Sequence, residues 1–129
     1  MLATIAKVEI PTTALVTAVG GSVCRFRVGV ISSVDGFINV TASITYPQYD
    51  EFGNFLGWFY LGEARSPHVD GLLAQVGSYL WFDLDFDMPS VPVRLAVTVW
   101  IWNGQAWAPQ ETKWPYDISP AGIVVGYTR

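Results

Sequence analysis

Residues 79–102 read YLWFDLDFDMPSVPVRLAVTVWIW, and this stretch decides the fold. Apolar and polar residues alternate in both of its halves, and a period of two is typical of β-strands that bury one face. Pro89 and Pro92 separate the halves with a turn. We therefore predict two strands, 79–87 and 93–102, whose inward side chains are Leu80, Phe82, Leu84, Phe86, Val93, Leu95, Val97, Val99 and Ile101.

The same alternation continues outward from this stretch, and helical periodicity is nearly absent. It predicts further strands at 4–10, 22–31, 37–46, 56–63, 105–108 and 122–128, and residues 15–19 could continue the first of these after a kink. Residues 48–54 predict a polar loop, and 64–77 form the least strand-like segment, with room for one helical turn around 72–75. About eight short strands separated by turn residues predict an all-β fold, an antiparallel β-sandwich, in a single domain spanning residues 1–129.

The composition is richer in apolar residues than a small solvated domain needs. Hydrophobic residues make up 51% of the 129 positions and charged residues only 14%, whereas about a quarter of the residues in ordinary globular domains are charged. A chain of this length builds one core. We expect copies of the same chain, or neighbours in a larger particle, to cover the surplus apolar surface.

The charge of the chain disfavours nucleic acid as a partner, and its cysteine content rules out an internal disulfide. The net charge is −4, and only Arg25 and Arg27 lie close together among the arginines, so no basic stripe could follow nucleic-acid phosphates. Cys24, the single cysteine, lies on the apolar face of a predicted strand, so we expect it to be buried, with no internal disulfide. We expect no cofactor and no bound metal.

The first residues do not read as a signal peptide, because they lack a basic segment and Lys7 and Glu9 interrupt any apolar run. No stretch approaches the roughly 18 uncharged apolar residues of a membrane span. We therefore expect synthesis in the cytoplasm without a signal peptide, and a location in a virion or another extracellular particle.

Two sets of polar residues have the composition of reactive or metal sites. Ser66, His68 and Asp70 share one loop, whereas hydrolases assemble their catalytic residues from separated segments. The second set is Asp83, Asp85 and Asp87, which point the same way at intervals of about 7 Å along one strand, too far apart to hold calcium without loop ligands. We interpret this set as an acidic stripe that keeps the protein soluble. Because the glycine and cysteine–histidine motifs of common enzymes are also missing, we predict that the protein is not an enzyme.

The candidate binding residues are four tryptophans, Trp81, Trp100, Trp102 and Trp107. A two-residue turn at 103–104 sets Trp100 opposite Trp107, and Trp102 opposite Gln105. A hairpin between 79–87 and 93–102 that pairs Asp87 with Arg94 sets Trp81 opposite Trp100. The indoles of Trp81, Trp100 and Trp107 then form an outward row across three strands, with Trp102 nearby.

Such a row has three interpretations that the sequence leaves open. The segment 109–120, with Trp114 and Tyr116, could fold over the row and cover it. The row could instead pack against a neighbouring protein subunit, or its flat faces could stack on the sugar rings of a glycan.

The layout resembles the immunoglobulin-like domains known as cell-adhesion-related domains of bacteria and archaea. Their opening consists of an apolar strand, a proline and a glycine-led strand of alternating valines, which is matched by 5–10 (IAKVEI), Pro11, the glycines at 20 and 21, and 23–30 (VCRFRVGV). Residues 86–89 (FDMP), then 93–102, a turn and Trp107 are similar to versions encoded by viruses and microbial surface proteins. The resemblance implies an immunoglobulin-like antiparallel β-sandwich and a non-catalytic role in surface proteins or virions.

We therefore expect a structural protein that assembles through protein–protein contacts, such as a capsid decoration, turret or tail-associated protein of a virion. Its partners would be copies of itself or other particle proteins, and Trp81, Trp100, Trp102 and Trp107 would make the contacts. The alternative is a carbohydrate-binding or adhesion module that uses the same tryptophans on glycans.

Overall fold

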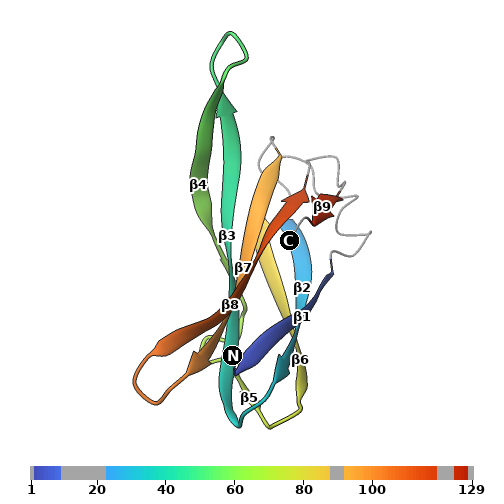
Figure 1. The fold of residues 1–129 in the computed structure, drawn as a ribbon, viewed down its shortest axis with the longest axis vertical. Helices are drawn as coiled ribbons and strands as arrows, with labels where there is room; N and C mark the ends of the chain where they lie inside the picture. Colours follow the sequence, from blue (N-terminus) through green and yellow to red (C-terminus); the bar gives the residue numbers. More distant parts are fainter. Residues whose placement is uncertain (1, 10–22, 88–91, 119–123, 128–129) are drawn as a thin grey trace.

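The computed structural model of the chain describes residues 2–9, 23–87, 92–118 and 124–127. These residues form nine β-strands and no helix, in two antiparallel sheets that pack against each other (Figure 1). The all-β prediction is therefore confirmed. Within the described segments nothing helical is long and apolar enough to cross a membrane. The predicted continuation at 15–19 lies outside the described residues.

The smaller sheet has three strands in the order β1, β2, β6, which span Ala3–Glu9, Val23–Ser32 and Tyr79–Asp87. The larger sheet has the order β4, β3, β7, β8, β9, and a short strand β5 also pairs with β3. Its strands are Phe55–Arg65 (β4), Gly36–Tyr49 (β3), Val93–Trp102 (β7), Trp107–Ile118 (β8), Val124–Tyr127 (β9) and Leu72–Ala74 (β5). The predicted bounds of the strands at 79–87 and 93–102 are confirmed.

The core lies between the two sheets and follows from the alternation in the sequence. The inward side chains of β6 and β7 are buried, apart from Leu80, which is partly buried, and Phe82 and Leu95 have no exposed surface. Phe26 of β2 packs edge-on against Phe86, with the ring centroids 6.2 Å apart. Cys24 is fully buried in the same layer, as predicted. Removal of these apolar side chains from water is the main contribution to stability.

The predicted hairpin between β6 and β7 is wrong. β6 pairs with β2 in the smaller sheet, whereas β7 pairs with β3 and β8 in the larger sheet. Asp87 accordingly lies opposite Val23, and Arg94 lies opposite Thr45. Alternation could not distinguish the two arrangements, because strands paired in one sheet and strands facing across a core bury the same apolar side chains.

Three other segment predictions are also wrong. Residues 72–75, where the sequence left room for a helical turn, contain β5, because their backbone pairs with the start of β3. Residues 48–54 are not all loop, since β3 continues to Tyr49. The short return strand expected at 105–108 is the much longer β8, so the segment 109–120, which could have folded over the tryptophans, belongs to the sheet as far as Ile118.

The hairpin of β3 and β4 extends well beyond the rest of the sandwich (Figure 1). Asp50 holds its turn, because the Asp50 carboxylate accepts hydrogen bonds from the backbone N–H groups of Phe52 and Asn54 at 2.9 and 2.8 Å. It also accepts one from the side-chain amide of Asn54. These bonds, those from Asn54 first, lower the pKa of Asp50 below its ordinary value. The turn is therefore ordered by its own side chains, outside the core.

Candidate functional site

The structure divides the four predicted tryptophans between the two sheets. Trp81 lies on β6 of the smaller sheet, opposite Gly29. Trp100, Trp102 and Trp107 lie on β7 and β8 of the larger sheet. The predicted row of Trp81, Trp100 and Trp107 is therefore wrong, because β6 and β7 are not neighbours in one sheet.

The loop between β7 and β8 changes the register that was expected on the larger sheet. The Asn103 N–H donates to the Ala106 carbonyl at 3.1 Å, and the Asn103 side-chain oxygen accepts from two backbone N–H groups of the loop. The loop therefore has four residues rather than two. As a result Trp102, rather than Trp100, lies opposite Trp107, and the two rings are in edge contact at 5.5 Å.

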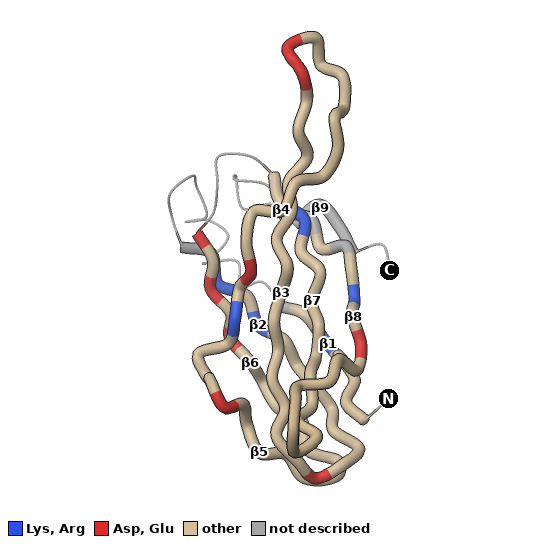
Figure 2. Tube along the Cα trace, turned by 90° about the vertical axis from the view of Figure 1, so that its left-hand side faces the viewer, with Lys and Arg blue, Asp and Glu red and all other residues tan. Residues whose placement is uncertain are grey.

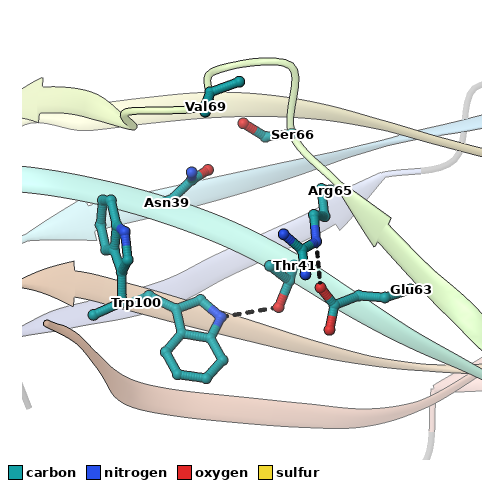
Figure 3. Close-up of a pocket in the computed structure, with 8 residues that line it drawn as sticks. Asn39, Thr41, Glu63, Arg65, Ser66, Val69 and Trp100 are labelled. Carbon is teal, nitrogen blue, oxygen red and sulfur yellow. Dashed lines mark hydrogen bonds and ion pairs between the residues drawn. The ribbon is translucent and has the colours of Figure 1, made fainter.

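An open cleft of about 470 Å³ lies on the outer face of the larger sheet (Figure 3). Residues of β3 and β4 that point away from the core meet there with tryptophans of β7 and β8 and with the loop after β4. The lining residues are Asn39, Thr41, Glu63, Arg65, Ser66, Val69, Trp100 and Trp107. The cleft thus combines indole rings with amide, hydroxyl and ionised side chains.

The two indoles in this cleft are held in place by the protein itself. The indole N–H of Trp100 donates to the Thr41 hydroxyl at 2.9 Å (Figure 3). Trp107 packs between Trp102 and the backbone at Gly71, where an added Cβ would lie 2.8 Å from the indole. Gly71 has a φ of +78°, a conformation that favours glycine. Both indoles are therefore preorganised before any ligand arrives.

The loop after β4 forms one wall of the cleft and accounts for two of the residues that were considered as catalytic. The Ser66 hydroxyl accepts a hydrogen bond from the His68 N–H at 3.1 Å, and the His68 carbonyl accepts one from the Asn39 amide at 2.8 Å. The His68 ring packs edge-on against the core residue Phe82 at 6.3 Å. Ser66 and His68 therefore shape the loop, while Asp70 lies apart in a second hollow.

This second hollow, of about 310 Å³, adjoins the first. Its lining residues are Phe37, Asp70, Trp102 and Trp107. Trp107 is the residue that lines both hollows. The outer face of the larger sheet therefore has two neighbouring depressions with one indole between them.

The charged side chains near these surfaces occur in pairs. One ion pair, Glu63–Arg65 at 2.7 Å, lies beside the cleft (Figure 3). Two more, Arg25–Asp85 at 2.7 Å and Arg27–Asp83 at 3.1 Å, lie on the smaller sheet. The hydrogen bond from Arg25 lowers the pKa of Asp85. Two of the three residues of the predicted acidic stripe, Asp83 and Asp85, are thus ion-paired with arginines of β2. In the described parts of the chain, no three His, Cys, Asp or Glu side chains are grouped to hold a metal ion.

A second candidate surface is the outer part of the β3–β4 hairpin, residues 46–61, which we call the aromatic hairpin. Among the described residues, 18 large hydrophobic side chains are exposed, and eight of them lie between 49 and 61. Phe52 is 81% exposed and Tyr60 is 65% exposed. The sequence analysis missed this surface, although residues 52–62 contain no charged side chain, which is the signal that could have identified it.

The aromatic hairpin continues the same outer sheet face that holds the cleft. Phe55 and Trp58 are in ring contact at 6.0 Å, and the Arg94 guanidinium lies 4.0 Å above the Trp58 ring. Two shifts in the pairing of β3 with β4 leave Leu56 and Leu61 without a residue opposite. Such bulges increase the local twist of a strand. The apolar side chains therefore point in several directions around the hairpin.

Comparisons with known proteins show a shared fold and no family. No family model matches the chain, and no curated protein matches it. The crystal structure of the C-terminal domain of Wzt is similar over 98% of this chain and 84% of that chain, with 14% identity and a TM-score of 0.54. Spo0M, a sporulation control protein from Bacillus subtilis, matches 84% of this chain and 48% of its own, with 16% identity and a TM-score of 0.46. The likeness to the Wzt domain concerns the all-β fold alone and does not establish the immunoglobulin-like family that the sequence resembles.

Proposed function

We propose that the chain is a non-catalytic structural protein of a virus particle that assembles through its aromatic hairpin. The observation that carries this proposal is the exposure of eight large hydrophobic side chains within the 13 residues 49–61. A capsid decoration, turret or tail-associated protein fits a sandwich with one projecting element. The likeness of 86–107 to virus-encoded immunoglobulin-like domains supports both the particle and the finer fold assignment.

An uncovered aromatic hairpin is unfavourable in water. A two-stranded hairpin by itself is marginally stable at best, and monomeric proteins rarely expose a large contiguous apolar patch. Phe59 is 41% exposed although it contacts Tyr46 across the strands. Covering a Phe side chain completely stabilises a complex by up to about 1.5–3 kcal/mol, so several such residues together favour association.

We propose a second copy of the chain as the partner of this hairpin. Residues 52–62 carry no charge, so two identical hairpins can meet without like-charge repulsion. Asp50 and Glu51 lie at the tip (Figure 2), and an antiparallel arrangement about a two-fold axis keeps the two tips apart. The same carboxylates disfavour insertion of the tip into a lipid bilayer. Because the bulges twist the edge of β4, packing of side-chain faces is favoured over strand addition.

Light scattering across a concentration series tests this assembly. We expect the wild type to self-associate and the double variant Leu56→Lys, Tyr60→Lys to dissociate at least tenfold more easily, since each lysine places a charge in the contact. The control variant Leu73→Lys, Val76→Lys changes two side chains that are similarly exposed, at 65% and 68%, outside the hairpin. A wild type that is monomeric at every concentration, or equal weakening by both double variants, would contradict the proposal.

A further inference from the structure

The cleft beside Trp107 offers flat apolar faces and hydrogen-bonding groups side by side. Thr41 accepts a hydrogen bond from Trp100 and keeps its own hydroxyl proton to donate. The Asn39 amide uses one of its two N–H groups on the His68 carbonyl. The carboxylate of Glu63 can accept further bonds besides that from Arg65. The site can therefore stack on a ring and bond to hydroxyl groups around its edge.

Other classes of ligand fit this cleft poorly. A phosphate or another anion needs unpaired positive charge, but Arg65 is already paired with Glu63 and the chain has a net charge of −4. A drug-like apolar ligand needs an enclosed pocket, whereas Val69 on the wall is 84% exposed. A peptide that adds a strand would pair along the free edge of β4. That edge lies on the far side of β3 from β7 and β8, so such a peptide would not cover Trp100 and Trp107.

We propose that this cleft binds an uncharged oligosaccharide, with a sugar ring stacked on Trp107. An apolar face together with a rim of hydroxyl groups is the chemistry of a pyranose ring, and it matches indole faces next to amide, hydroxyl and carboxylate groups. Trp107 lines both hollows, of about 470 and 310 Å³, so the ligand is a chain of two or more sugars that passes this indole. This binding site is distinct from the aromatic hairpin.

The position of Trp107 depends on Gly71. A Cβ at this position would lie 2.6 Å from the Ile38 carbonyl oxygen and 2.8 Å from the Trp107 indole. The φ of +78° also disfavours any other residue there. Gly71 is therefore a positioning residue that lets the loop seat against the indole. Gly104, with a φ of +97° and nothing within 4 Å of an added Cβ, provides the matched control for backbone strain.

Indole fluorescence during titration with cellohexaose, maltohexaose, mannohexaose, xylohexaose and laminarihexaose tests the proposal. We expect at least one hexasaccharide to bind, and to bind better than its monosaccharide, because two hollows are occupied. Trp107→Ala should weaken that binding about tenfold, the loss expected for one aromatic contact. Trp114→Ala removes an indole that is 53% exposed and lies outside both hollows, and it should change the affinity less than twofold.

Further variants keep the result interpretable if Trp107→Ala misfolds. Trp107→Phe retains a flat ring and should bind more tightly than Trp107→Ala, and Gly71→Ala should weaken binding more than Gly104→Ala. No response to any of the five hexasaccharides, or equal losses from Trp107→Ala and Trp114→Ala, would overturn the glycan site. The variant Leu56→Lys, Tyr60→Lys should still bind the sugar, so failure of the hairpin assembly and failure of this site are separate results.

Discussion

The outer face of the smaller sheet and the aromatic hairpin are both antiparallel strand pairs that face solvent, but their cross-strand pairs have opposite chemistry. On β2 and β6 an arginine lies directly opposite an aspartate twice, as in Arg25 and Asp85. On the hairpin Tyr46 lies opposite Phe59, and a second aromatic pair follows nearer the turn. Exposed ion pairs gain little free energy from being covered by a partner, whereas exposed aromatic pairs are stabilised by further burial. Under the assembly proposed above, the aromatic hairpin is therefore the surface that a second copy covers.

The same contrast runs along a single strand. The first half of β3 buries alternate side chains in the core, among them Ile38 and Val40 with no exposed surface. Its second half continues past the other sheet, where Tyr49 is 60% exposed (Figure 1). The buried half therefore anchors the exposed half, and the sandwich supplies the stability that the hairpin lacks.

The largest difference between the sandwich core and the aromatic hairpin is expected in the free energy of unfolding when a phenylalanine in each is replaced by alanine. Phe82→Ala removes a fully buried ring from β6 and should lower the free energy of unfolding by about 3–5 kcal/mol. Phe59→Ala removes the same atoms from the hairpin, where the ring is 41% exposed, and should cost less than about 1 kcal/mol in the dilute protein. Urea denaturation measures both. Similar losses would mean that the hairpin belongs to the folded core, and the distinction between the two regions would be lost.

The strands could be predicted because the alternation of apolar and polar side chains can be read from neighbouring residues in the sequence. Alternation over β6 and β7 predicted the strands and their inward side chains correctly, because successive side chains of a strand point to opposite faces and one face of each of these strands packs on the core. Pairing partners could not be predicted in the same way. Which sheet a strand joins depends on contacts far apart in the sequence, and β6 meets β2 rather than its neighbour in the chain.

The candidate sites were predicted only in part, for the same reason. Trp100 and Trp107 were singled out from the sequence, but the cleft they line needs Asn39, Glu63 and Arg65 from other strands. The aromatic hairpin was missed because the polar residues at 48–54 indicate a loop, and a loop conceals how far the strands around it project. Sequence pattern shows which residues are apolar, but not whether a second sheet lies beneath them.

The reactivity of a thiol in the core and of one at the hairpin tip should show a smaller difference between the same two regions. Burial, together with the nearby Asp85 carboxylate, raises the pKa of Cys24 to about 11. At pH 8 the native thiol should therefore react with iodoacetamide at least about a hundredfold more slowly than in the denatured chain, because the thiolate is the reactive species and the side chain is fully buried. The native rate should rise as the pH approaches 11. A cysteine placed at the hairpin tip by Phe52→Cys, in a Cys24→Ala background, should react like an unfolded thiol when dilute.

The second thiol also reports on assembly. Its reaction should slow as the protein concentration rises, since a partner covers the tip or its surroundings, whereas the rate at Cys24 should not depend on concentration. A native Cys24 that reacts as fast as a denatured thiol would show that the sandwich opens readily, and it would contradict the assignment of stability to that region.

The smallest effect is expected at the ion pairs of the smaller sheet. A double-mutant cycle with Arg25→Gln and Asp85→Asn should give only a small coupling in the free energy of unfolding, because both side chains are well exposed, at 61% and 43%. Salt should weaken it further. Because the pKa of Asp85 is lowered in the folded state, the coupling should persist above the ordinary carboxyl pKa of about 4 and disappear as the pH falls through the folded value. A coupling that is large, or that grows with protein concentration, would mean that this face is also part of a contact, and the ion-paired strands would then no longer mark the free surface of the molecule.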